Sequence, residues 1–447
     1  MKQYEQDMTQ GNLWKQIWVY SVPLMFTNLL QVLFNFADIA IVGRFGEPGA
    51  IGSVGSTTTL IGLFTGIVIG LSGGANVIVA RARGGKDSAK TKEAVHTAAV
   101  IMLLAGLLLS VAGIVLAPNI LTAMHTKPEL LDNAILYFRI YFLGMPALAL
   151  YNYGNAVLSS VGDTKRPLYF LAFAGAINVV LNLIFVVFFH MNVAGVALAS
   201  VISQAVSAIL VLRVLLKSDA DYGLHIKELS VKKNVAGSIL RIGLPTAAQF
   251  AIFQIANIFI QMGVNSFDAI TVEGTAAAAN AESLLYQMAA AFYAAGTTFI
   301  SQNLGARKKE RILKSYLVSQ TSATLLSFTL GLLLAIFGRY FLGFFTPNPA
   351  VIEAGMYRLK VMGFTCWLST LMDGTIAASR GLGETVTPTI IVFLGSCVFR
   401  IVWIYTVFAF FGTITSLYLV YACSWSITAI AEIIYFTKLY KRKGATL

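Results

Sequence analysis

Long stretches without a charged residue constrain this chain more than any other feature. Residues 16–37 carry no charge, and neither do residues 167–212. A helix needs about 20 apolar residues to cross the hydrocarbon of a bilayer. Only 12% of the 447 residues are charged and 57% are hydrophobic, whereas soluble domains carry about 25% charged residues. The sequence therefore excludes a soluble or disordered chain and predicts an integral membrane protein.

The charge-free runs, together with spans around Glu282 and Asp373, predict twelve transmembrane helices. Basic residues cluster in alternate loops, for example at 81–92, 165–166, 307–314 and 438–443. Cytoplasmic loops are enriched in Lys and Arg, so these loops share one side and both termini are expected to be cytoplasmic. The basic residues that produce the net charge of +12 are therefore explained by the orientation of the protein in the membrane. We expect no nucleic-acid binding. We expect a multi-pass protein of a bacterial plasma membrane, the cell inner membrane.

The two halves of the chain repeat each other. Residues 162–167 read GDTKRP and residues 383–388 read GETVTP, while Pro23 returns as Pro245. A near-constant offset indicates duplication. Each half holds six spans, an even number, so both insert the same way up as parallel repeats.

The predicted fold is therefore all-α, with twelve transmembrane helices in two six-helix bundles flanking a cleft. We predict an N-terminal lobe at 1–216, a cytoplasmic linker at 217–238 and a C-terminal lobe at 239–447. Apolar residues between lysines in the linker fit a helix on the membrane surface or a plain solvated connection.

Three carboxylates interrupt the predicted spans: Asp38, Glu282 and Asp373. A carboxylate at mid-bilayer costs about 2.5–3.5 kcal/mol on insertion scales, and such residues are functional by default. Asn35 precedes Asp38 by about one turn, so both lie on one helix face, and Asn35 is a candidate for the substrate cleft. Burial favours the protonated form of a carboxyl group, and Asp38 is therefore a candidate proton carrier. A purely structural aspartate, satisfied by neighbouring amides, is the alternative.

Asn178 and Asn182 are four residues apart, which places both amides on one helix face. With Asp38 they suit Na⁺, which prefers oxygen ligands, and they suit a proton site equally well. Hydrogen bonds between helices, common in membrane proteins, are the alternative. We predict no other metal site.

The second half has a different polar set as candidates for a substrate cleft: Gln249, Gln254, Glu282, Asp373 and Arg400. Arg400 either pairs with Glu282 or Asp373 and neutralises it, or belongs to a substrate site. Glu432 is expected to be an end-of-helix charge paired with Lys438.

Residues 70–74 read GLSGG, which matches the serine motif of hydrolases. That chemistry needs a strand–turn–helix elbow and a histidine base, whereas Ser72 lies inside a helix-length span. A hydrolase using Ser72 is a third hypothesis, but we predict no enzyme and no catalytic residue. No nucleotide motif or cofactor motif occurs, so transport would be driven by an ion gradient.

The chain resembles the multidrug and toxic compound extrusion (MATE) family over nearly its whole length. The matching stretches are DIAIVGRFG at 38–46, SQNLGA at 301–306 and the two Gly-Asp/Glu-Thr-x-x-Pro loops. The resemblance implies twelve helices in two lobes and export of cationic organic compounds in exchange for H⁺ or Na⁺. It assigns Asp38, Asn178 and Ser200 to the cation site of the first lobe.

Two departures from the family pattern bear on the coupling ion. Asn182 stands where many members carry Asp, which weakens the case for a tight Na⁺ site. Gln249 and Gln254 are neutral where other members place a glutamate, which is the second departure. Asp373, in contrast, resembles an acid that the family carries in helix 10.

The sequence thus predicts a secondary active multidrug antiporter that works by alternating access. We expect it to act as a monomer on small cationic drugs. A lipid-linked oligosaccharide flippase of the same superfamily is the alternative. Such a cargo carries phosphate and calls for a cationic cleft, whereas three deep acids against Arg400 favour a cationic cargo.

Overall fold

The computed structural model describes residues 5–445, and all regular structure in that range is helical. The helices are α1 Leu13–Phe45, α2 Ala50–Gly84, α3 Ser88–Ala123, α4 Pro128–Leu143, α5 Met145–Ser160, α6 Lys165–Leu183, α7 Asn192–Leu216, α8 Lys233–Val264, α9 Ala269–Gly305, α10 Lys309–Leu342, α11 Pro349–Gly381, α12 Val386–Val392, α13 Phe399–Trp403, α14 Ala409–Phe411 and α15 Ile414–Gly444. The shorter elements are η1 Ile184–Phe188, η2 Ile226–Glu228, η3 Phe393–Val398 and η4 Ile404–Phe408. The predicted all-helical class is confirmed.

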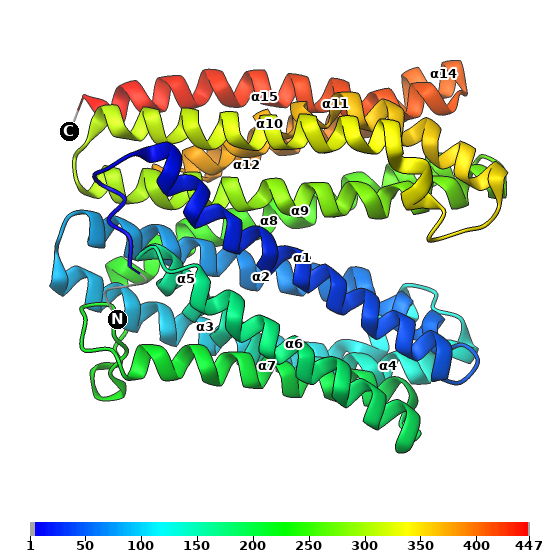
Figure 1. Ribbon diagram of the computed structural model, residues 1–447, viewed down its shortest axis with the longest axis horizontal. Coiled ribbons are helices and arrows are strands. Elements are labelled where there is room, and N and C mark those ends of the chain that lie inside the picture. Colours follow the sequence, from blue (N-terminus) through cyan, green and yellow to red (C-terminus); the bar gives the residue numbers. More distant parts are fainter. Residues whose placement is uncertain (1–4, 446–447) are drawn as a thin grey trace. The chain divides into compact units, whose positions relative to one another are not determined.

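The chain forms two compact units, within each of which the helices lie side by side (Figure 1). The first unit contains Phe26–Ala247 and the residues up to Asp7, and the second contains Met8–Met25 and Ala248–Leu447. Two helices therefore contribute to both units: α1 divides after Met25 and α8 after Ala247. This differs from lobes divided at a single linker.

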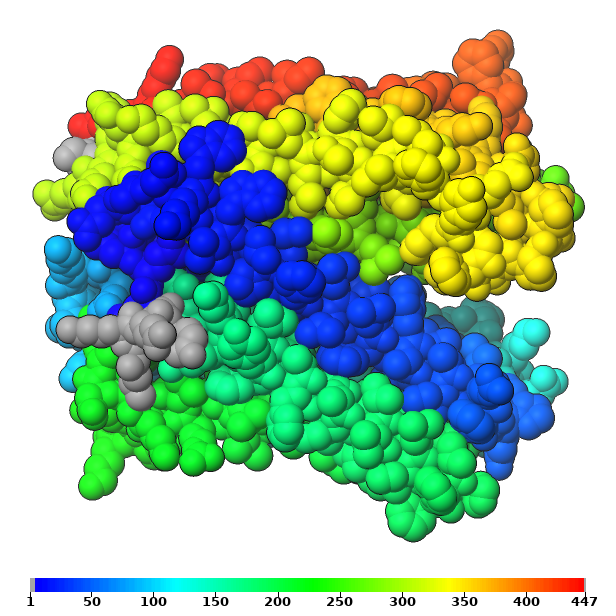
Figure 2. Space-filling model, viewed as in Figure 1, coloured from blue at the N-terminus to red at the C-terminus, as the bar shows by residue number. Residues whose placement is uncertain are grey.

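A proline lies shortly before each of these divisions, Pro23 in α1 and Pro245 in α8. Proline lacks the N–H that would bond the preceding turn, so the helical ladder is weakest there. The first part of α1 then packs on α9 and α10, where Ile17 and Tyr20 share a core with Phe299. The outer face of this first part of α1 is visible in dark blue in Figure 2.

Nine helices within 5–445 are long and apolar enough to cross a membrane, or ten if α4 and α5, which meet at 44°, form one bent span. The two remaining predicted spans are α9 and α11, with 37 and 33 residues. At 1.5 Å per residue they are about 55 Å and about 50 Å long, respectively. Hydropathy thus supports ten of the twelve predicted spans, and length alone supports the other two, which carry Glu282 and Asp373.

The repeated loops fold alike. Gly162 follows α5 with φ of 93°, and Gly383 follows α11 with φ of 85°. Both values lie in the left-handed region that glycine enters without steric penalty. The glycine ends one helix and allows the next to begin within a few residues, which explains why this residue recurs in both halves.

Within the first unit, the connection between α7 and α8 is partly buried. Tyr222 and Leu224 are buried, whereas Ile226 and Val231 are exposed. Helix α8 begins at Lys233, so the connection is shorter than the predicted 217–238. Its placement on a membrane surface stays a prediction.

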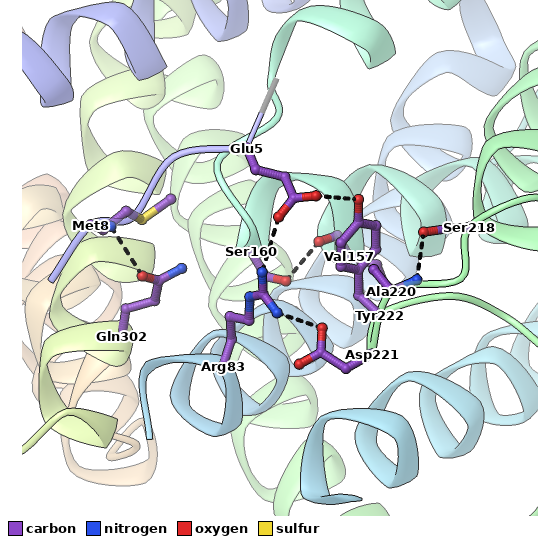
Figure 3. A network of polar contacts seen from close by, with 10 residues as sticks. All are labelled: Glu5, Met8, Arg83, Val157, Ser160, Ser218, Ala220, Asp221, Tyr222 and Gln302. Carbon is purple, nitrogen blue, oxygen red and sulfur yellow. Dashed lines mark hydrogen bonds and ion pairs between the residues drawn. The ribbon is translucent and has the colours of Figure 1, made fainter. Parts of the chain in front are cut away.

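Arg83 at the end of α2 holds this connection (Figure 3). Its guanidinium pairs with Asp221 at 2.5 Å and with Glu5 at 3.0 Å. The Tyr222 hydroxyl donates to Glu5 at 2.9 Å, and burial raises the pKa of this hydroxyl, as does the hydrogen bond to Glu5. Tyr222 therefore acts as a neutral donor. The network thus fixes the connection to the end of α2.

Candidate functional site

A polar cluster lies in the first unit where α1, α6 and α7 meet, and it contains Asp38, Asn178, Asn182 and Ser200. Ser200 Oγ donates to Asp38 Oδ2 at 3.1 Å, and Asn182 Nδ2 donates to Asp38 Oδ1 at 2.5 Å. Asn182 Nδ2 also contacts Asn178 Oδ1 at 3.2 Å, and Asn178 Nδ2 donates to Ser200 Oγ at 3.4 Å. The structure brings together all four residues that the sequence singled out.

A close approach of α1 to α6 builds this cluster. A Cβ atom at Gly175 would lie 1.7 Å from the ring of Phe34, so only glycine fits there. Asp38 lies one turn after Phe34, and Asn178 lies about one turn after Gly175. The same helix faces that meet at Gly175 therefore bring the carboxylate to the amides.

The partners of Asp38 are neutral. Asn178, Asn182 and Ser200 are at most 6% exposed, while Asp38 itself is half-buried. Within residues 5–445 no ion pair involves Asp38. Asn182 Oδ1 is buried, and no hydrogen-bond partner for it occurs in the described chain. The cluster thus offers acceptor oxygens and one negative charge.

Asn35 lies outside this cluster. Its side chain is exposed within the unit and its Nδ2 donates to Gln31 O of the same helix at 3.0 Å. Although Asn35 and Asp38 lie on one helix face, Asn35 does not share the hydrogen-bond partners of Asp38.

In the second unit Glu282 on α9 makes a two-pronged ion pair. Arg358 on α11 donates through Nε and Nη2 to the two carboxylate oxygens, each at 2.8 Å. The Arg358 guanidinium also lies over the rings of Tyr418 and Tyr421, 5.3 and 5.5 Å from their centroids. Arg358 is 6% exposed. The predicted pairing of Glu282 with Arg400 is therefore wrong.

Arg400 has neutral hydrogen-bond partners. Its Nε donates to Ser424 Oγ and its Nη1 donates to Asn257 Oδ1, both at 3.1 Å. Asp373 on α11 interacts electrostatically with Arg380 and Arg400, but no ion pair of Arg400 occurs in the described part of the chain. Of the alternatives considered for Arg400, the interaction with Asp373 is therefore electrostatic and without a direct ion pair in the described chain.

The two candidate glutamines lie apart. Gln249 is buried and its Oε1 accepts from Arg380 Nη2 at 3.1 Å, whereas Gln254 is exposed. Neither Arg358 nor Arg380 was among the candidate site residues predicted from the sequence. The 33-residue length of α11 places Arg358 well inside a helix, a signal that the span around Asp373 already contained.

Glu432 does not pair with Lys438. Its side chain is 0% exposed, and neither carboxylate oxygen has a partner among residues 5–445. Its neighbours on the α15 face, Ala429 and Phe436, belong to apolar clusters. A spacing of six residues turns Lys438 away from Glu432 on a helix with 3.6 residues per turn.

Ser72 lies inside α2, and its Oγ donates to Ile69 O at 2.9 Å. A Cβ atom at Gly70 would lie 2.6 Å from the backbone of Ala247, and one at Gly74 would lie 2.5 Å from Ile239 O. These glycines let α2 and the start of α8 pack closely, so residues 70–74 are a packing motif.

Comparison with known proteins places this architecture in a family. The family model MatE matches residues 23–184 and 245–406, which confirms the internal repeat. The chain is 27% identical to the probable multidrug resistance protein YpnP of Bacillus subtilis over 88% of each chain. It is 25% identical to the probable multidrug resistance protein NorM of Thermotoga maritima over 85% of this chain and 82% of that protein. A crystal structure of a MATE protein in the bent conformation aligns with a TM-score of 0.90 over 98% of each chain, at 21% identity.

Proposed function

The chain belongs to the MATE family of membrane transporters, and from this premise we propose that it exports cationic organic compounds in exchange for H⁺ or Na⁺, with Asp38 as the coupling residue. The multi-pass architecture and the absence of an enzymatic role follow from the family. The relatives are named multidrug resistance proteins, which supports drug-sized cargo. We further propose plasma-membrane insertion with cytoplasmic termini; the end residues 1–4 and 446–447 lie outside the described residues.

One observation carries the proposal: the Asp38 carboxylate has neutral hydrogen-bonding partners. Amide and hydroxyl groups both donate and accept, so they stabilise the carboxylate and also accept from the protonated acid. A carboxylate held by arginine would have to break an ion pair to take a proton. Asp38 is thus arranged to change charge, and alternating access follows if the two protonation states favour different conformations.

The same cluster supports Na⁺ as an alternative coupling ion. Carboxylate, amide and hydroxyl oxygens are ligands for hard cations, and Asn182 Oδ1 is an acceptor without a partner in the described chain. Asn182 adds no charge, however, so Asp38 would supply the only negative ligand. A proton needs one carboxylate, and the arrangement therefore favours H⁺.

Proteoliposomes test the proposal. Purified protein is reconstituted, a pH gradient or a Na⁺ gradient is imposed separately, and ethidium movement is followed by fluorescence. We expect the wild type to move ethidium under at least one gradient and Asp38→Asn to move none. Glu129→Gln, the same chemical change at an exposed site in α4, is the matched control and should retain wild-type transport.

Transport by Asp38→Asn at the wild-type rate would refute the coupling role. The lipid-linked oligosaccharide flippase remains the competing function. It would be favoured if neither gradient moved ethidium while a gene deletion accumulated lipid-linked sugar and left drug resistance unaltered.

A further inference from the structure

The stretch 226–233, in the connection between α7 and α8, exposes apolar and basic side chains together. The exposed apolar residues are Ile226, Leu229 and Val231, and the exposed basic residues are Lys227, Lys232 and Lys233. Ile226 is 68% exposed. With Glu228 included, the stretch carries a net charge of +2. It therefore combines an apolar surface with a positive one.

Hydrogen bonds hold this stretch against α3. The His225 backbone N–H donates to His96 Nε2 at 3.0 Å. Thr97 Oγ1 donates to Ser230 O at 3.3 Å and accepts from the Lys232 backbone N–H at 3.2 Å. His96 is 2% exposed and Thr97 is fully buried. The stretch is thus fixed on one face of α3, at the level of Thr97.

Thr97 marks the depth at which α3 enters the hydrocarbon. It lies nine residues after Ser88, where α3 begins, which is about 14 Å along the helix. The next twenty residues, 98–117, contain a single polar side chain, Ser110, and about 20 apolar residues cross the hydrocarbon. The stretch 226–233 therefore lies at the boundary between the polar and apolar parts of α3 and not at the helix tip.

The face of α3 that carries Thr97 is the face that contacts lipid further along. Leu104, Leu108 and Val111 follow Thr97 by 7, 11 and 14 residues, so all four share one side of the helix. The three apolar side chains are 59–70% exposed, and α3 contains a window with a mean hydropathy of 2.8. The stretch 226–233 thus covers the polar end of a lipid-facing surface.

Position and composition together indicate the partner. Segments with apolar residues and lysines lie in the membrane interface, with the apolar groups at the headgroup–acyl boundary and the amines near anionic lipids. Lysine stems are long enough to cover apolar surface while the ammonium group stays among polar groups. A solvated connection would leave Ile226 and Leu229 in water. The depth along α3 favours lipid over a soluble protein.

We propose that residues 226–233 bind anionic phospholipids at the membrane interface, with the three apolar side chains at the headgroup–acyl boundary and the three lysines on lipid phosphates. The partner is a lipid surface, so the inference goes beyond the proposed export of cations. It depends on neither Asp38 nor the coupling ion.

Hydrogen–deuterium exchange tests this proposal on the full-length protein. The protein is placed in nanodiscs of phosphatidylcholine alone or with half phosphatidylglycerol, and exchange of the amides in 226–233 is followed by mass spectrometry. One lysine near an anionic surface strengthens attraction about fivefold, so phosphatidylglycerol should slow exchange at least about fivefold. Equal exchange in the two lipids would overturn the proposal. Nanodiscs expose both membrane faces, so the result does not depend on orientation.

A soluble anion provides the second arm. Glycerol 3-phosphate is added to the phosphatidylcholine nanodiscs at the concentration of the phosphatidylglycerol. We expect no slowing of exchange in 226–233, because the apolar side chains need a lipid surface. Slowing equal to that with phosphatidylglycerol would show a site for free phosphate compounds and refute the lipid assignment.

Two double variants locate the contact. Lys232→Gln/Lys233→Gln should lose most of the slowing caused by phosphatidylglycerol. Lys86→Gln/Lys90→Gln is the matched control, because it removes two exposed lysines near the start of α3. Lys90 precedes Thr97 by seven residues, about 10 Å along the helix, which is about one screening length, so the control should keep the slowing. An equal loss in both variants, or in neither, would refute the assigned site.

Leu229→Ser tests the apolar contact. Exchange in 226–233 should become faster in both lipids, and unchanged exchange would refute insertion of this side chain. Exchange of residues 98–117 within α3 should stay the same in every variant, which verifies that the first unit is folded. Ethidium transport by Asp38→Asn bears on the proposed function alone, whereas lipid-dependent exchange bears on this surface alone, so the two failures are distinguishable.

Discussion

The two units both bury carboxylates in helices, but they surround them differently. Asp38 in the first unit accepts from an amide and a hydroxyl. Glu282 in the second unit accepts from a guanidinium through both oxygens, and Asp373 interacts with Arg380 and Arg400. A single negative charge stands among neutral groups in one unit, whereas charges of both signs are interleaved in the other.

This difference teaches that the partner, and not burial alone, decides what an intramembrane acid can do. Protonating a carboxylate that is held by an arginine would leave a buried cation without its counter-ion, which is costly. A carboxylate held by amides and hydroxyls keeps its hydrogen bonds in both charge states. The proposed ion coupling therefore fits the first unit, whereas the second unit holds paired charges of both signs.

Breaking the ion pair of the second unit should have the largest effect on stability. Arg358→Met leaves Glu282 without its counter-ion, and removing one partner of a buried pair costs about 3–5 kcal/mol. We expect the lower end, because the Glu282 side chain is 21% exposed. The double variant Arg358→Met/Glu282→Met should recover most of this loss. Thermal unfolding in detergent measures both, and a double variant as unstable as the single one would show that Arg358 acts by packing alone.

Glu432 offers a third environment, a buried carboxyl group with no partner in the described chain. Burial of an unsatisfied polar group costs about 1–3 kcal/mol in protein mutational data. Glu432→Met should therefore raise the free energy of unfolding by about that amount and leave ethidium transport unchanged. Loss of transport in a stabilised variant would break the comparison, since it would reveal an ion-coupling acid in the second unit.

Ser200→Ala tests the hydrogen bonding of Asp38 in the first unit and should have the smallest effect of the three variants. One donor to the Asp38 carboxylate is lost, and a hydrogen bond to a charged group contributes about 1.5–3 kcal/mol, so transport should slow by about tenfold or more. Initial rates in proteoliposomes measure the effect. Ser203→Ala on the same helix, where the hydroxyl donates to Ser200 O, is the matched control, and an equal loss there would mean that any serine in α7 matters.

The repeat and the first-unit cluster were predictable because they depend on local spacing. An offset near 221 residues needs no structure to detect, and Asn178 and Asn182 must share a face at a spacing of four. Contacts across helices were harder to predict. Arg358 pairs with Glu282 over a separation of 76 residues, and neither local sequence indicates which residue is its partner.

The sequence by itself determined that the chain crosses a membrane as helices and that its halves are duplicated, because composition and helical periodicity act within single segments. It also nominated Asp38 as the candidate coupling acid, which stays a prediction. Only the tertiary structure decided which cation faces which acid. It also decided that α1 and α8 each serve both units and that Glu432 is left without a partner in the described chain. These outcomes depend on how faces of distant helices meet, and packing, unlike periodicity, is a property of pairs of segments.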